Sequence, residues 1–111
     1  MNQPEVAPPS RSELDVLLRA VNHPYRRHTL QYLVQVTEPQ PVADIAAAVN
    51  ERMDQQSPSD RQQLALALIH RHLPRLNDAE LIEWTHRNLV APTATTSDAV
   101  AVFETAAEYF E

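Results

Sequence analysis

The chain has 111 residues and a formal net charge of −6, which is the size of one ordinary domain. It contains no glycine, no cysteine and no lysine. Phosphate-cradling loops and the serine nucleophile elbow need glycine, thiol chemistry and disulfides need cysteine, and Schiff bases need lysine. No set of nucleophile, base and acid is apparent either, so we expect no enzymatic activity and no bound cofactor.

The hydropathy pattern predicts a cytoplasmic protein without membrane contact. The longest unbroken apolar run, Leu64–Ile69, is far shorter than a bilayer-spanning segment. Residues 1–10 contain three prolines and no basic residue, unlike a signal peptide, and we expect residues 1–11 to form a disordered tail. The nine arginines without lysine fit either a GC-rich genome or adaptation to high salt.

Apolar spacing predicts helices in the first half of the chain. A capping-box pattern from Ser10 to Glu13 begins the first helix, and the residue before Pro24 ends it. Pro24 suits the first position of a second helix, which extends to about Val36. Residues 38–41 are expected to be a linker, residues 42–53 a third helix, and residues 54–58 a polar break.

The longest predicted helix runs from about Asp60 to Asn77, behind a second capping box that starts at Ser59. The alternation in residues 64–68 also fits a strand, but alanine is a poor strand former and the flanking residues favour a helix. Pro74 removes one backbone hydrogen bond, which predicts a kink or break near Leu73.

The last third predicts a hairpin and a final helix. Residues 81–85 alternate as a strand does, residues 86–88 form a turn, and residues 89–91 return, with Pro92 ending the pairing. Ser97 is expected to cap a helix with an apolar stripe of Ala99, Phe103, Ala106 and Phe110. The fold class is therefore mainly α with a short β-hairpin.

This order of elements is typical of a winged helix-turn-helix, which places one helix in the DNA major groove. Residues 22–27, Asn-His-Pro-Tyr-Arg-Arg, resemble the start of the second helix in arsenical-resistance-type repressors, and residues 71–79 resemble the end of their recognition helix. The segment His72-Leu73-Pro74-Arg75-Leu76, followed by Asp78-Ala79, is more similar to a haloarchaeal winged helix-turn-helix domain family of unknown function. The resemblance covers about residues 12–90. It implies a winged-helix domain at 12–92, a C-terminal helix at 97–111 and a recognition helix at about 60–77.

The chain departs from these relatives in three ways. Glu80 stands where they have glycine, so we expect a different turn in which Glu80 avoids a positive φ. The break before the recognition helix is longer than a compact helix-turn-helix turn. The metal-sensing cysteines of the repressors are absent, so thiol-based sensing does not carry over.

The charge distribution is compatible with double-stranded DNA as a partner. Residues 11–36 and 59–76 are the only positive segments, each with a net charge of +2, although two small excesses among five segments also arise by chance. Gln63 would read adenine and Arg71 would reach guanine or a phosphate, whereas ordinary solvent exposure is the plain alternative for each. The expected DNA-contacting residues are Arg61, Gln63, Ala67, His70, Arg71, Arg75 and Arg87.

Two further possibilities follow from the same patterns. Phe103, Ala106 and Phe110 would form the seam of a homodimer, or would pack back onto their own domain. The apolar run 64–69 and the acidic composition favour a protein-interaction module without DNA binding as the alternative function. His70 and His72 lie about 200° apart on a helix, so we expect no metal site there.

Overall fold

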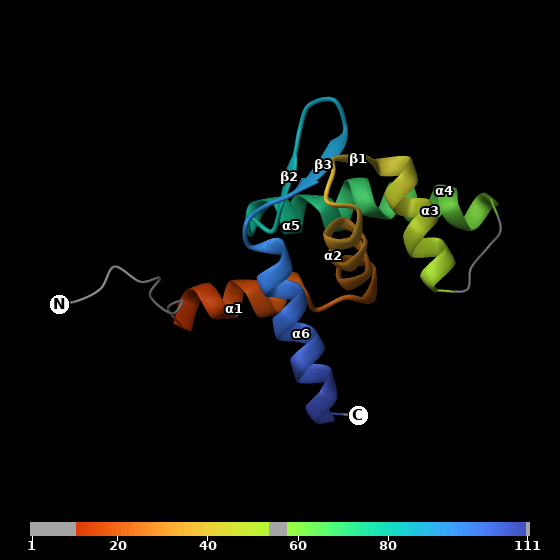
Figure 1. The fold of residues 1–111 in the computed structure, drawn as a ribbon. Helices are drawn as coiled ribbons and strands as arrows, with labels where there is room; N and C mark the ends of the chain where they lie inside the picture. The colour runs from red at the N-terminus through yellow and green to blue at the C-terminus, as the bar shows by residue number, and fades with distance from the viewer. Residues whose placement is uncertain (1–10, 54–57, 111) are drawn as a thin grey trace.

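The computed structural model describes residues 11–53 and 58–110 as a helical domain with a small antiparallel sheet (Figure 1). This confirms the predicted fold class, and the arrangement is compatible with a winged helix. The predicted bounds of the second helix, 24–36, are those observed. In chain order the elements are α1 (Arg11–Ala20), α2 (Pro24–Val36), β1 (Gln40–Pro41), α3 (Val42–Arg52), α4 (Pro58–Ala67), the π-helical turn η1 (Leu68–His72), α5 (Leu73–Asp78), β2 (Ile82–Trp84), β3 (Leu89–Pro92) and α6 (Thr96–Phe110).

The sheet has three strands in the order β1-β3-β2, where the sequence predicted a two-stranded hairpin. The expected linker was wrong at its end, because Gln40 pairs with Val90. The Tyr32 hydroxyl donates to Gln40 Oε1 at 2.9 Å and holds this edge strand, where proline is tolerated. Pro92 is the last residue of β3 and lies opposite Ile82, so the pairing ends there, one residue beyond the expected strand 89–91.

The core lies where α2 meets α3, α6 and the long helix formed by α4, η1 and α5. α2 crosses the middle of the molecule (Figure 1). Its apolar face packs with α3 and with the first turns of α6. Side chains with no exposed surface come from every layer: Leu30, Leu33, Ile45, Val49, Leu68, Leu73, Leu76, Val90 and Ala99. The long helix is therefore fixed to the domain along its buried side.

The distortion predicted near Leu73 is present as a π-helical turn, not as a break. The Leu73 N–H donates to the carbonyl of Leu68, five residues back. Pro74 follows directly, and its missing N–H and bulky ring disfavour the regular pattern there. The extra residue in this turn lets His72 and Leu73 both be buried, at 1% and 0% exposure.

Two expected helix caps are wrong, and one lies at Ser10, outside the described residues. α4 begins at Pro58, before Ser59, because proline suits the first helical position. α6 begins at Thr96, before Ser97. The Thr96 hydroxyl accepts from Thr93 N–H and donates to the Leu81 carbonyl, both at 2.7 Å, so the start of α6 is tied to the beginning of the sheet. Of the polar break expected at residues 54–58, residues 54–57 lie outside the described residues and Pro58 belongs to α4.

The expectation for Glu80 is wrong, because its φ is +62°. The Leu81 N–H donates to the Leu76 carbonyl and the Glu80 N–H to the Asn77 carbonyl, both at 3.0 Å, which is a Schellman cap. This cap satisfies two end carbonyls of α5 and buries Leu81 against Leu76. The Glu80 carbonyl also accepts from the hydroxyls of Thr93 and Thr95, both at 2.9 Å. These contacts offset the free-energy cost of the left-handed backbone conformation at Glu80.

Replacing Glu80 by glycine is therefore expected to stabilise the protein. A left-handed conformation costs a residue with a Cβ on the order of 1 kcal/mol, and glycine lacks this cost. The expected rise in melting temperature is a few degrees, measured by circular dichroism. Glu80→Ala is the control, because alanine keeps the Cβ and should leave the melting temperature nearly unchanged. An equal rise in both variants would show that the side chain, not the backbone, sets the effect.

Candidate functional site

The long helix exposes one face that carries most of the predicted contact residues. Leu64, Leu68 and Leu76 point into the core, and the opposite side is open. Leu66 lies in the middle of this open side with 56% of its surface exposed. Of the predicted DNA-contacting residues on this helix, Arg61, Gln63, His70, Arg71 and Arg75 are exposed and Ala67 is half-buried.

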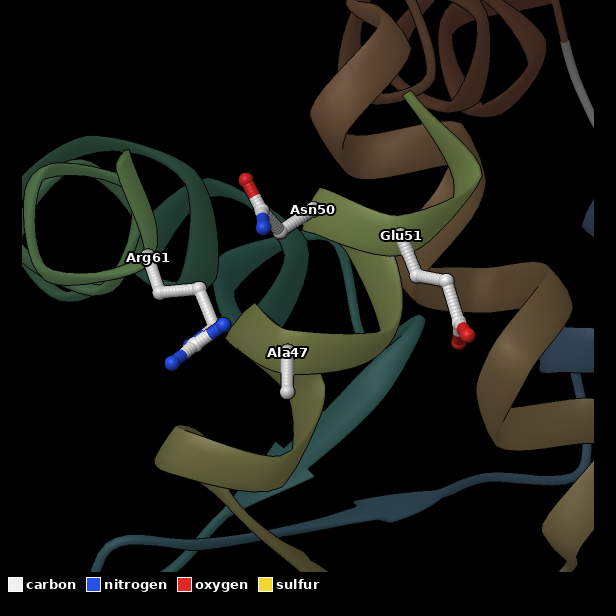
Figure 2. Close-up of a pocket in the computed structure, with 4 residues that line it drawn as sticks. All are labelled: Ala47, Asn50, Glu51 and Arg61. Carbon is white, nitrogen blue, oxygen red and sulfur yellow. The ribbon is translucent and has the colours of Figure 1, made fainter. Parts of the chain in front are cut away.

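The structure separates the predicted arginines into three places. Arg61 lies at the beginning of α4 beside α3, in a shallow cleft of about 300 Å³ that it lines with Ala47, Asn50 and Glu51. Figure 2 shows the Arg61 side chain directed toward α3, whereas Glu51 points away from it. Arg71 and Arg75 lie at the other end of the long helix. Arg87 is exposed in the turn between β2 and β3.

Arg26 connects the end of the long helix that carries Arg71 and Arg75 to α1 and α2. We call the place where these three helices meet the junction. Its guanidinium is buried and donates through Nη1 to the carbonyls of Arg19 and Ala20, each at 3.2 Å. Its Nε donates to Nδ1 of His72 in the long helix, also at 3.2 Å. Arg27 donates to the Val21 carbonyl at 2.8 Å. The two arginines thus cap the C-terminal end of α1, where cations are favoured.

The same junction holds the side chains of His23 and His72 in place. His23 caps α2, since its Nδ1 accepts from the Tyr25 N–H at 3.1 Å. The rings of His23 and Tyr25 contact the His72 ring, with centroids 4.3 and 5.4 Å away. The two segments quoted for the resemblance, residues 22–27 and 71–79, therefore meet in space. Much of the role of these two segments is thus to form a contact inside the domain.

Arg26 is not among the site residues predicted from the sequence, although a signal was present. Arg26, Thr29, Leu30 and Leu33 recur at helical spacing and are all buried. An arginine in the apolar stripe of a helix indicates a buried guanidinium with carbonyl partners, because an unpaired buried charge is too costly. No partner for His72 was predicted from the sequence.

The junction carries a concentration of positive charge, which we call the arginine cluster: Arg19, Arg26, Arg71 and Arg75. Burial lowers the pKa of Arg26, and the neighbouring charges of Arg75 and Arg71 lower it further. In the part of the chain that the structure describes, no carboxylate forms an ion pair with any of these four residues. The cluster is thus a local excess of cations in an acidic protein.

The environment of His72 predicts a loss of stability in acid. Burial lowers the pKa of His72 to about 4, and the charges of His23, Arg26, Arg71 and Arg75 act in the same direction. The unfolded chain takes up a proton near pH 6.5, whereas the folded chain does so only near pH 4. Stability is therefore full above pH 6.5 and falls as the pH drops through this window.

Between pH 7 and pH 5, His72 alone should cost roughly 2 kcal/mol of unfolding free energy, measured by urea denaturation. The pKa values of His23 and His28 are also lowered, chiefly by burial, so they add to the trend. His72→Asn keeps an acceptor near the Nδ1 position but cannot titrate, so its stability should depend less on pH. An unchanged pH dependence in this variant would contradict the assignment.

The predicted dimer residues differ in their exposure within the described structure. Phe103 is half-buried against the core of its own domain, and Ala106 is exposed. The side chain of Phe110 lies outside the described residues. The large apolar side chains that the described part of α6 exposes are those of Val102 and Tyr109, at 37% and 81%.

Residues 11–53 and 58–110 contain neither a candidate metal cluster nor a bilayer-spanning helix. No three histidine, aspartate or glutamate side chains gather there in a way that could hold a metal ion. No helix in this part of the chain has the length and apolar content needed to cross a bilayer.

The fold and the site define a small helical domain with a three-stranded sheet, compatible with a winged helix. The family model of a domain of unknown function, DUF7344, matches residues 18–91. The chain belongs to this family. The match includes both segments that meet at the Arg26–His72 contact. No curated protein and no solved structure is detectably similar to the chain.

Proposed function

We propose that the protein binds double-stranded DNA as a winged-helix regulator, with the long helix α4–η1–α5 as its recognition helix. The observation that carries this proposal is the open face of that helix, with polar side chains on a backbone that the core holds rigidly. Gln63, His70 and Arg71 are exposed on it. Amide and guanidinium groups on a helix are the groups that read base edges in the major groove.

Each contact residue has a role set by its position. Gln63 and Arg71 face outward from the long helix and would contact bases, while Arg61 and Arg75 lie nearer its ends and would contact phosphates. Arg87 sits in the turn of the hairpin, where a wing would reach the neighbouring backbone. His70 and Ala67 complete the surface.

Net acidity is compatible with this function. The positive charge is concentrated in the arginine cluster, at one end of the recognition helix, although the chain as a whole is negative. Attraction between arginine and phosphate weakens steeply as salt rises. In the concentrated salt of a haloarchaeal cytoplasm, which the sequence resemblance implies, the −6 charge opposes binding less than it does in dilute buffer.

A second candidate function is a protein-interaction module, which exposed apolar side chains favour. Leu66 occupies the centre of the open helix face, and α1 exposes Leu14, Val16 and Leu18 at 39–50%. Leucine does not suit a polar groove except against a thymine methyl. In this alternative the same helix face docks on a partner protein, and α6 pairs with its copy through Phe103, Ala106 and Phe110 to give a homodimer.

A direct comparison of two variants separates the candidates. DNA binding is measured by fluorescence anisotropy with the duplex upstream of the protein's own gene, for wild type, Arg71→Ala and Leu66→Gln. The DNA proposal expects Arg71→Ala to weaken binding and Leu66→Gln to retain at least part of it. The interaction-module alternative expects no saturable DNA binding by any of the three, and a change in sedimentation or partner capture for Leu66→Gln.

A further inference from the structure

The cleft between α1 and α5 has the composition of an anion site. It has a volume of about 230 Å³ and is lined by Val16, Arg19, Ala20, Arg26, Arg75, Asp78 and Ala79. Three of these residues are arginines from three different helices and one is an aspartate, so the lining residues carry a net charge of +2. No ion pair in the described part of the chain neutralises these arginines.

Arg26 gives the cleft a fixed donor. Its Nε and Nη1 are bound to His72 and to the end carbonyls of α1, so the orientation of the guanidinium is set. Its Nη2 makes no hydrogen bond in the described residues, and it is not among the buried atoms that lack a partner. Nη2 therefore keeps some exposed surface, and Arg26 is one of the residues that line the cleft.

The side chains of the two other arginines are not held in place by hydrogen bonds as that of Arg26 is. Arg19 and Arg75 are exposed on α1 and α5, and neither makes a side-chain hydrogen bond in the described structure. Arg75 is close enough to lower the pKa of Arg26 through its charge. Asp78 lines the same cleft but forms no ion pair with these arginines in the described structure. The like charges therefore repel one another, and an anion between them would relieve this repulsion.

We propose that this cleft binds a small tetrahedral oxyanion of the phosphate class, held by Arg19, Arg26 and Arg75. Guanidinium groups donate in pairs to phosphate oxygens, and a tetrahedral anion offers oxygens to groups arriving from several directions. A planar carboxylate would satisfy one fork only. Asp78 at the border accepts from a protonated phosphate oxygen. The site shares Arg75 with the proposed DNA-contacting residues, whereas Arg19 and Arg26 are outside that set.

The test is a titration of the whole chain with inorganic phosphate at pH 7, followed by nuclear magnetic resonance. Ionic strength is held constant with chloride, because phosphate also stabilises proteins without specific binding. Saturable shifts are expected in the amide signals of Ala20 and Ala79, which line the cleft. Arg75→Ala should weaken the fitted affinity about tenfold or more, and Arg61→Ala, which removes the same charge beside α3, should not. Shifts that never saturate, or equal affinities in both variants, would overturn the site.

A second arm identifies the source of the anion. Duplex DNA is titrated onto wild type and Arg19→Ala, with and without phosphate. Equal DNA affinities together with saturable phosphate binding support a free anion in the cleft. Competition between phosphate and DNA, with weaker DNA binding by Arg19→Ala, supports the same site filled by a backbone phosphate. If inorganic phosphate fails to bind while Arg19→Ala weakens DNA binding, the small-anion site is wrong and the cleft belongs to the DNA surface.

Discussion

Arg26→Ala is expected to lower the free energy of unfolding by about 3 kcal/mol. The substitution removes three hydrogen bonds from a buried charged group and leaves the Ala20 carbonyl and Nδ1 of His72 without this donor, while the Arg19 carbonyl keeps the Asn22 N–H. Hydrogen bonds to charged groups contribute about 1.5–3 kcal/mol each, and they are not additive. Part of the loss is offset, because the charge of Arg26 no longer repels Arg71 and Arg75.

Urea denaturation monitored by circular dichroism measures this effect, and two variants make it specific. Arg26→Met fills a similar volume but caps nothing, so it should remain destabilised if the hydrogen bonds are the cause. Arg19→Ala changes an exposed side chain of α1 and should stay within about 0.5 kcal/mol of wild type. A loss below 1 kcal/mol in Arg26→Ala would mean that the junction does not hold α1 to the domain.

Arg71→Ala is expected to weaken DNA binding about tenfold or more at low salt. A guanidinium that contacts a base contributes about 1–3 kcal/mol to the preference for that base, and one that contacts a phosphate adds about one unit to the salt slope. Arg71 is exposed and forms no ion pair in the described residues, so the stability of the variant should match wild type. The loss of DNA affinity would then come from the missing contact between Arg71 and DNA, and not from unfolding of the variant.

Arg52→Ala is the matched control for this measurement. It removes the same charge from the end of α3, where the guanidinium donates to Gln35 and is not a predicted DNA contact. Equal losses in the two variants would show a general charge effect in place of a contact by Arg71. The dependence of each affinity on potassium concentration separates a base contact from a phosphate contact, since only the latter changes the slope.

Much of the fold follows from local sequence patterns. The bounds of α2 follow from Pro24 and from apolar spacing, and the hairpin follows from alternation on either side of residues 86–88. β1 does not, because two residues that contain proline have no strand pattern of their own and pair only when β3 is already in place. Long-range pairing of this kind is outside what a local pattern encodes.

Glu80 is a second example of a feature that a local sequence pattern does not predict. The free-energy cost of a left-handed backbone at Glu80 led to the prediction of a different turn. The helix cap, the burial of Leu81 and the hydrogen bonds from the threonine hydroxyls outweigh this cost. The threonines lie 13 and 15 residues away, so no window around Glu80 could include them. The exposure of Gln63, His70 and Arg71 was predictable from helical spacing, whereas the arginine cluster was not, because it brings together side chains from separate helices.

The most direct test of the central proposal is an anisotropy titration of the wild-type protein with the duplex upstream of its own gene. A scrambled duplex of the same length and composition is titrated in parallel, at low and at high potassium concentration. We expect saturable binding that favours the upstream duplex and weakens as potassium rises, with the preference retained at high potassium. Binding that does not saturate, or equal binding of both duplexes under both conditions, would contradict a role for the α4–η1–α5 helix in reading DNA.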